Sequence, residues 1–266
     1  GSRAAPSLLG GVGGREARSV TGRERVIFAL DVPGAEQALA WVERLSGEVG
    51  AFKVGLELFV AAGPDLVRAL VERGERVFLD LKFHDIPATV AGATRVAGGF
   101  GAWLVNVHAL AAPEAMARAA AAARDGAAAA GRPAPKVLAV TVLTSHRERD
   151  LVAIGLDGPP SAAVLRLAAR ARDAGLDGVV ASPLEAARIR KLWPGGLVVT
   201  PGVRPAGADR GDQARVATPA GALAAGADFL VVGRPIRDAA DPVAAARAIV
   251  AEVEGLRTGQ CALAEI

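Results

Sequence analysis

Two carboxylates and an ammonium group lie close together in the apolar segment LDLKFHDIPATV, residues 79–90. Asp80 and Lys82 are two positions apart, so in a strand their side chains project from one face, about 6.5 Å apart along it. Asp85 follows three residues later. Charged groups packed this densely in an apolar segment are typical of sites that stabilise charge or move protons.

Lys53 adds a second ammonium group, in the apolar run AFKVGL at residues 51–56. Its neighbours Phe52 and Val54 share one face of the strand, so Lys53 points to the other face. A buried cation is costly unless it is paired, and Asp80 is the expected partner on the neighbouring strand. Lys53 and Asp80 alone fit a structural ion pair equally well. The further charges of residues 79–90 favour a functional site.

A second type of chemistry is indicated by VVGRP, residues 231–235. Gly233 allows close approach of the backbone, and the guanidinium group of Arg234 matches a phosphate group. The Gly- and Pro-rich segment 201–213 carries Arg204 and Gln213, and it is predicted to be a lid that closes on an anion. For Arg204 alone, an ordinary solvated arginine is the alternative, but beside Arg234 the phosphate interpretation is favoured.

Metal chemistry is not predicted. The three histidines, His84, His108 and His146, do not have the spacing of a zinc site. His108 lies in an apolar strand and is expected to be a buried histidine with its hydrogen bonds satisfied. The carboxylates of residues 79–90 could suggest Mg²⁺, but the lysines beside them already supply positive charge, so no metal is needed.

The elements that position these residues alternate between short β-branched runs and segments of helical period, a pattern typical of repeated βα units. Eight strands are predicted, at residues 26–31, 51–56, 76–82, 103–109, 136–143, 178–182, 197–203 and 229–235. Helices between them are predicted to carry a proline in the first turn, at Pro64, Pro87, Pro113, Pro160 and Pro242. This pattern predicts an α/β fold, a single (β/α)₈ TIM barrel, in which chemistry gathers where the strands end.

The predicted domain organisation is a leader at residues 1–24, the barrel at 25–255 and a tail at 256–266. Two longer connections are expected, a surface loop at 125–135 and a segment at 145–160 that carries an extra short helix. The leader contains no apolar core typical of a signal peptide.

The amino-acid composition excludes several classes of protein and disfavours several kinds of partner. The 266 residues are 52% hydrophobic, and 31 basic against 28 acidic residues give a net charge of +3, which excludes a disordered polar chain. Basic residues form no long run, so nucleic-acid and membrane partners are not predicted. The single cysteine, Cys261, allows no intrachain disulfide, and a reducing cytoplasm is the expected location.

The segment at residues 79–90 contains D-x-K-x-x-D-I-P and resembles the signature of the orotidine 5′-phosphate decarboxylase family. The similarity extends through FALDV, FKVGLELF, VNVHA, AVTVLTS, TPGVRP, GDQ and VVGRP, and covers residues 26–254. The resemblance implies loss of CO₂ from C6 of orotidine 5′-monophosphate (OMP) to give UMP, a step of pyrimidine biosynthesis, with no cofactor. It also implies a homodimer.

The resemblance implies roles residue by residue. The catalytic charged network would be Lys53, Asp80, Lys82 and Asp85, with Lys82 as the proton donor to C6. Asp85 and Thr89 would enter the active site of the partner subunit. The substrate contacts would be Asp31 and Lys53 for the ribose, Thr144 and Ser145 for the pyrimidine, and Arg204, Gln213, Gly233 and Arg234 for the phosphate. The chain contains no tyrosine, whereas some members of the family place one in the phosphate loop.

Two other functions remain open. A sugar-phosphate enzyme of the same superfamily, such as a 3-keto-gulonate 6-phosphate decarboxylase or a hexulose-phosphate synthase, resembles the chain in D-x-K-x-x-D. Such an enzyme uses Mg²⁺ and has an acid where this chain has Lys53, so Lys53 and the D-I-P sequence favour the nucleotide enzyme. The second is a nucleotide-binding protein without activity, which the complete charged network disfavours.

Overall fold

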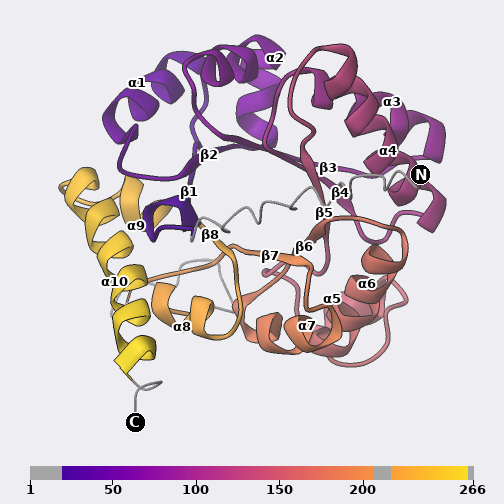
Figure 1. The fold of residues 1–266 in the computed structure, drawn as a ribbon. Coiled ribbons are helices and arrows are strands. Elements are labelled where there is room, and N and C mark those ends of the chain that lie inside the picture. Colours follow the sequence, from indigo (N-terminus) through magenta and orange to yellow (C-terminus); the bar gives the residue numbers. More distant parts are fainter. Residues whose placement is uncertain (1–19, 206–216, 263–266) are drawn as a thin grey trace, which may run out of the picture.

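A computed structural model describes residues 20–205 and 217–262. Within those residues, parallel strands form a closed barrel in which each strand pairs with the next along the chain and the last pairs with the first (Figure 1). The strands are β1 (Val26–Ala29), β2 (Ala51–Val54), β3 (Val77–Phe83), β4 (Leu104–His108), β5 (Lys136–Val140), β6 (Gly178–Val180), β7 (Leu197–Thr200) and β8 (Phe229–Val232). The predicted (β/α)₈ barrel is therefore confirmed.

Helices surround the barrel on its outside (Figure 1). The α-helices are α1 (Ala35–Leu45), α2 (Leu56–Glu72), α3 (Pro87–Gly99), α4 (Pro113–Ala129), α5 (Glu148–Ala153), α6 (Pro160–Asp173), α7 (Ala186–Leu192), α8 (Pro219–Ala224), α9 (Arg234–Arg237) and α10 (Pro242–Ala262), and the 3₁₀-helices are η1 (Arg23–Arg25) and η2 (Pro183–Glu185). The predicted extra helix after the fifth strand is α5. Helix α4 takes up part of the loop expected at residues 125–135, and α10 continues past residue 255.

Each predicted strand is present, but most of them end earlier than predicted. Strand β5 ends at Val140 and β7 at Thr200, three residues before the predicted ends. The apolar residues that follow, among them Val142 and Val203, are buried without being part of the strands. Apolar residue types therefore continue past the strand ends, because the chain there still packs in the hydrophobic core.

Four of the five predicted prolines begin a helix, at α3, α4, α6 and α10. Pro64 lies inside α2, directly after Gly63, whose φ of 67° interrupts the helical backbone. Pro64 thus begins the second of two helical segments that meet at a kink. The prediction missed the first segment, because its residues follow β2 with only Gly55 between them.

Two apolar layers stabilise the barrel. Alternate strand residues such as Ile27, Ala29, Phe78 and Leu138 form a cluster inside it. The residues between them, such as Phe28, pack against the helices in a larger cluster.

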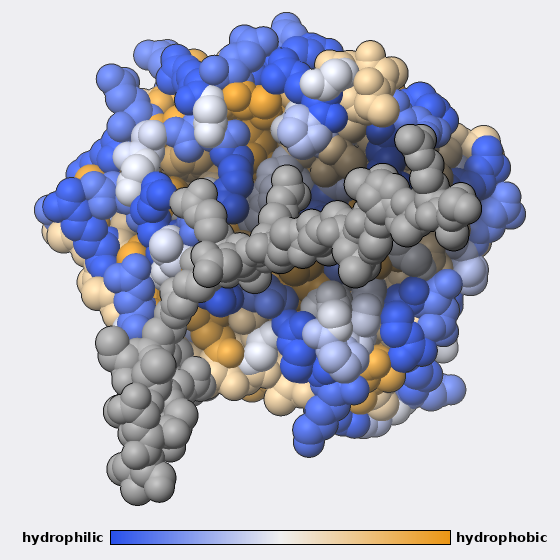
Figure 2. All heavy atoms as spheres, viewed as in Figure 1, coloured by the Kyte–Doolittle hydropathy of each residue, from blue (hydrophilic) through white to orange (hydrophobic). Residues whose placement is uncertain are grey.

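On the face that Figure 2 shows, hydrophilic residues predominate around the circumference, as expected for helices whose outer sides meet water. Among the described helices, none is long and apolar enough to cross a membrane.

Helices α3 and α4 approach each other more closely than side chains would allow. A Cβ atom on Gly98 of α3 would lie 2.1 Å from the carbonyl oxygen of Ala123, and one on Gly126 of α4 would lie 1.9 Å from that of Arg95. Real Cβ contacts of this length essentially do not occur. The two helix backbones therefore pack directly against each other at these glycines.

We expect Gly98→Ala to lower the free energy of unfolding by about 2–3 kcal/mol, because the added methyl group forces the two helix backbones apart. Urea denaturation at a fixed protein concentration measures this change. Gly99→Ala is the matched control. Its Cβ would lie 3.6 Å from the Gly126 oxygen, an ordinary contact, so its stability should stay within about 0.5 kcal/mol of the unchanged chain. Equal losses in both variants would contradict the packing argument.

Candidate active site

A cavity of about 390 Å³ lies at the carboxyl ends of the strands. Most of the residues predicted for the site line it, namely Asp31, Lys53, Asp80, Lys82, Thr144, Ser145, Arg204, Gly233 and Arg234. They come from β1, β2, β3, β5, β7 and β8 or from the segments that follow these strands. The barrel thus brings together residues that are up to 203 positions apart in the sequence.

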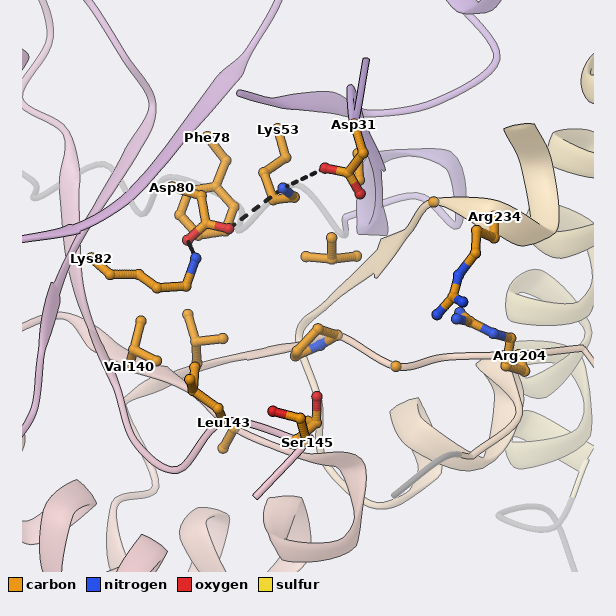
Figure 3. A pocket seen from close by; sticks show the side chains of 18 of the residues that line it. Asp31, Lys53, Phe78, Asp80, Lys82, Val140, Leu143, Ser145, Arg204 and Arg234 are labelled. Atoms are coloured by element: carbon orange, nitrogen blue, oxygen red, sulfur yellow. Dashed lines mark hydrogen bonds and ion pairs between the residues drawn. The ribbon is translucent and has the colours of Figure 1, made fainter. Parts of the chain in front are cut away.

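Four of these residues form a row of alternating charge on one wall (Figure 3). Lys53 Nζ lies 3.1 Å from Asp31 Oδ1 and 3.5 Å from Asp80 Oδ2. Lys82 Nζ lies 2.7 Å from Asp80 Oδ1. Lys53 is buried in β2, so two carboxylates compensate the cost of removing its charge from water.

Strand β3 is irregular where it carries this chemistry. Its pairing with β4 shifts between Leu79 and Phe83. Within this irregularity Lys82 has a φ of 52°, and it is the only residue other than glycine with a positive φ among the described residues. The backbone therefore turns locally out of the extended conformation, and the side chain of Lys82 bends back to Asp80.

Asp80 is held in its ionised form. Burial by itself would raise the pKa of Asp80. The charges of Lys53 and Lys82, together with hydrogen bonds from Lys82 and Asn106, outweigh burial and lower the pKa below its ordinary value. The cavity therefore keeps a carboxylate between two ammonium groups.

The opposite side of the cavity is basic. Figure 3 shows the guanidinium groups of Arg204 and Arg234 close to each other, across the cavity from the charged row. Arg204 is buried, and it lies where the chain after β7 meets Ala217 through a backbone hydrogen bond. Arg234 begins α9 directly after Gly233. Two neighbouring guanidinium groups repel each other, and a bound phosphate group would remove this repulsion.

Asp85 and Thr89 do not reach this cavity. Both are exposed and line a second hollow, about 330 Å³, at the start of α3, and Lys82 lines both this hollow and the cavity. Asp85 Oδ1 accepts a hydrogen bond from the backbone N–H of Ile86. Among the described residues no ion pair joins Asp85 to Lys82. The fourth member of the predicted network is therefore separate from the other three within one chain. Gln213 lies outside the described residues.

Three residues of the site were missed or given no role in the sequence analysis. Arg237 lines the cavity and donates a hydrogen bond to the backbone oxygen of Asp31. Its spacing of three from Arg234, on one helix face, was the available signal. Gly55 leaves room for Lys53, since a Cβ there would lie 3.0 Å from Lys53 Nζ. Asn106 bonds to Asp80 and Lys82, which only the pairing of β3 with β4 reveals.

The three histidines gather near Lys82. The rings of His84 and His108 stack with their centroids 5.4 Å apart. His108 accepts a hydrogen bond at Nδ1 from the backbone N–H of Leu110. Burial, the neighbouring His84 and His146 and the charge of Lys82 lower the pKa of His108 to about 4. His108 is thus a neutral, half-buried histidine. Within the described residues, no group of three or more His, Cys, Asp or Glu could hold a metal ion.

The pKa of His108 predicts a pH dependence of stability. The folded chain binds this proton only near pH 4, whereas an unfolded histidine binds it near pH 6.5. Between these values the unfolded state holds more protons, so the free energy of unfolding decreases as the pH falls. The free energy of unfolding should therefore fall between pH 7.5 and pH 5, and we expect His108→Gln to make this fall smaller by about 1 kcal/mol. The expected effect is modest because the ring is partly exposed to solvent. Denaturant titrations at both pH values measure this. An equal loss in both proteins would contradict it.

Comparisons with known proteins agree with this geometry. Residues 24–249 match the model of the orotidine 5′-phosphate decarboxylase / HUMPS family. An orotidine 5′-phosphate decarboxylase of Moorella thermoacetica is 56% identical over 87% of this chain and 93% of that protein. One of Halorhodospira halophila is 57% identical over 88% of this chain and 98% of that protein.

A solved structure shares the fold. The crystal structure of orotidine 5′-phosphate decarboxylase from Lactobacillus acidophilus matches with a TM-score of 0.73 and 38% identity, over 86% of this chain and 98% of that one. These findings confirm the predicted resemblance and the prediction of an enzyme of the decarboxylase class. The chain belongs to the orotidine 5′-phosphate decarboxylase / HUMPS family.

Proposed function

We propose that the chain converts OMP to UMP and CO₂ without a metal or cofactor. The observation that carries this proposal is one cavity with a row of alternating charge on one wall and a pair of arginines on the other. A nucleotide 5′-monophosphate has the matching shape, with a dianion at one end and the reacting ring at the other. The relatives' names support the same substrate.

The charged row suits the chemistry of this reaction. Loss of CO₂ leaves an electron pair in an in-plane orbital at C6, which the ring delocalises poorly. A positioned cation stabilises this charge, and a proton donor completes the product. Lys82 can do both, and its contact with Asp80 fixes where the ammonium group lies. The proton passes from Lys82 Nζ to C6, while the C6–carboxylate bond breaks and its electron pair stays on C6.

The remaining residues would bind the substrate at a distance from C6. Arg204, Gly233 and Arg234 are proposed to hold the phosphate, together with Gln213. Asp31 and Lys53 would bind the ribose hydroxyls, and Thr144 and Ser145 would contact the pyrimidine. Binding energy at the phosphate, remote from the reacting atom, can then be used to order the charged row.

The proposed unit is a homodimer. Asp85 and Thr89 do not line their own chain's main cavity, and an apolar residue directly after Asp85 is exposed. This residue, Ile86, is 66% exposed at the start of α3. An exposed aliphatic side chain beside a separated network member favours a face that a second copy covers. Asp85 and Thr89 would then enter the partner's cavity.

An absorbance assay of OMP consumption, with and without EDTA, tests the proposed function. We expect decarboxylation to UMP at the same rate in both conditions. Turnover of 3-keto-gulonate 6-phosphate that EDTA abolishes would instead assign the chain to the sugar-phosphate enzymes. Binding of UMP with no turnover of OMP would indicate a nucleotide-binding protein. A place in pyrimidine biosynthesis and a cytoplasmic location follow from the proposed activity.

A further inference from the structure

Asn106 is a fully buried residue of β4 that bonds to Asp80 and Lys82, the last two members of the charged row. Its Oδ1 accepts a hydrogen bond from the backbone N–H of Lys82, at 2.8 Å. Its Nδ2 donates one to Asp80 Oδ1, at 2.7 Å. Both ends of one carboxamide group are therefore used, one on the backbone of the proposed proton donor and the other on the carboxylate that binds this donor.

The backbone that Asn106 holds is in an unfavourable conformation. Lys82 has a φ of 52°, in the left-handed region that residues with a Cβ rarely adopt. Strand β3 pairs with β4 at Leu79–Val105 and again at Phe83–Val107, so three residues of β3 lie opposite Asn106 alone. The N–H of Lys82 is directed at the Asn106 side chain. The Asn106 side chain thus accepts from the Lys82 N–H the hydrogen bond that a backbone carbonyl of β4 would accept in a regular strand pair.

The second bond controls where the ammonium group lies. Asp80 Oδ1 accepts from Asn106 Nδ2 and from Lys82 Nζ, both at 2.7 Å. Because the buried Asn106 amide holds Asp80 Oδ1 in place, this oxygen defines the position of the Lys82 ammonium group. Without this amide, only the mobile ammonium groups of Lys53 and Lys82 hold the Asp80 carboxylate. The carboxylate can then rotate, and the Lys82 ammonium group moves with it.

We propose that Asn106 is a positioning residue of the reaction: its carboxamide holds the left-handed backbone of Lys82 and the Asp80 oxygen that directs the Lys82 ammonium group. The proposal rests on the proposed function for the identity of the reaction. Asn106 itself touches neither the substrate nor the reacting atom. Its effect is on the step in which the proton is delivered, and the phosphate side of the cavity does not depend on it.

A carboxamide is required because the position needs an acceptor and a donor at the same time. An ionised aspartate at position 106 could accept from the Lys82 N–H, but it would meet Asp80 Oδ1 with a second negative charge. A protonated aspartic acid could both accept and donate, as the amide does. Two carboxyl groups at this distance raise the pKa of one of them. Lowering the pH should therefore restore the amide-like arrangement in Asn106→Asp.

The kinetic experiment compares Asn106→Ala and Asn106→Asp with the unchanged enzyme on OMP between pH 5 and pH 8. We expect Asn106→Ala to lower kcat about 100-fold at every pH, the effect of a misplaced group, with KM and the affinity for UMP changed less than threefold. For Asn106→Asp, kcat relative to the unchanged enzyme should rise at least tenfold from pH 8 to pH 5. Asn106→Ala should show no such rise.

Thr141→Val is the control for the loss of a buried hydrogen bond at a strand end. Thr141 is buried just after β5, and its hydroxyl donates to the Val180 backbone oxygen. That oxygen keeps a bond from the Thr141 backbone N–H, so nothing is left unsatisfied. We expect kcat of Thr141→Val within threefold of the unchanged enzyme. A 100-fold loss in this control, or a flat pH profile for Asn106→Asp, would overturn the assignment.

Crystal structures of the unchanged chain and of Asn106→Ala test the positioning without any turnover. We expect the Lys82 φ to leave the left-handed region and the contact between Lys82 Nζ and Asp80 Oδ1 to lengthen or break. An unchanged Lys82 backbone and contact would overturn the proposal, whatever the kinetics. If the unchanged chain does not decarboxylate OMP, the proposed function fails, and these structures still decide whether Asn106 positions Lys82.

Discussion

Replacing Lys82 by alanine is expected to lower kcat for OMP by at least about a thousandfold, or about 4 kcal/mol of transition-state stabilisation. The substitution removes the proposed proton donor and the cation beside C6 together. It also leaves Asp80 with a single ammonium partner, Lys53, at 3.5 Å. The phosphate side of the cavity is untouched, so UMP should still bind. Single-turnover kinetics and calorimetric titration with UMP measure the two effects.

Lys136→Ala is the control for this experiment. Lys136 begins β5, at the opposite end of the barrel from the cavity, and pairs with Asp177 in an exposed position. We expect this variant to keep its activity. If Lys82→Ala retains a tenth of the turnover, a deficit of only about 1.4 kcal/mol, then Lys82 is not the proton donor.

Mixing two inactive variants, Lys82→Ala and Asp85→Ala, is expected to restore activity. In the proposed dimer, each active site takes Lys82 from one chain and Asp85 from the other. A mixed dimer then has one site that lacks both groups and one site that is intact. With random exchange of equal amounts, half of the dimers are mixed and half of their sites are intact. About a quarter of the original activity per site should return, as two-fold symmetry requires.

The matched control mixes Lys82→Ala with Asp80→Ala. These two residues contact each other within one chain, at 2.7 Å, so every site of every mixed dimer lacks one of them. No activity should return. If subunits exchange and Lys82→Ala with Asp85→Ala also remains inactive, Asp85 does not act across a dimer interface.

Much of the fold could be predicted because each strand and helix carries its own local pattern. The β-branched runs predicted every strand, and prolines marked the starts of α3, α4, α6 and α10. Strand ends were less predictable, since buried apolar residues such as Val203 continue beyond the last backbone pairing. The kink at Gly63 was missed because glycine and proline mark a break without telling whether a helix precedes it.

The site was predictable where its residues lie at strand ends, and unpredictable where it depends on pairing between strands. Lys53 and Asp80 could be paired from the alternation of side chains alone. The irregularity at Lys82 depends on how β3 pairs with β4, so neither the left-handed backbone nor the role of Asn106 has a local signal. The separation of Asp85 from the cavity follows from the turn into α3.

The alternating row of charges also determines how dissolved salt acts on this protein. The formal charges of Asp31, Lys53, Asp80 and Lys82 sum to zero, so at distances beyond the cavity their fields largely cancel. On the arginine side, three guanidinium groups, of Arg204, Arg234 and Arg237, line the cavity and have the Asp238 carboxylate near them. This excess of positive charge attracts a dianionic ligand from solution. Ionic strength should therefore slow the association of a nucleotide, which depends on this long-range attraction. The proposed proton transfer from Lys82 takes place among charges that lie 2.7–3.5 Å apart, so dissolved salt hardly screens it.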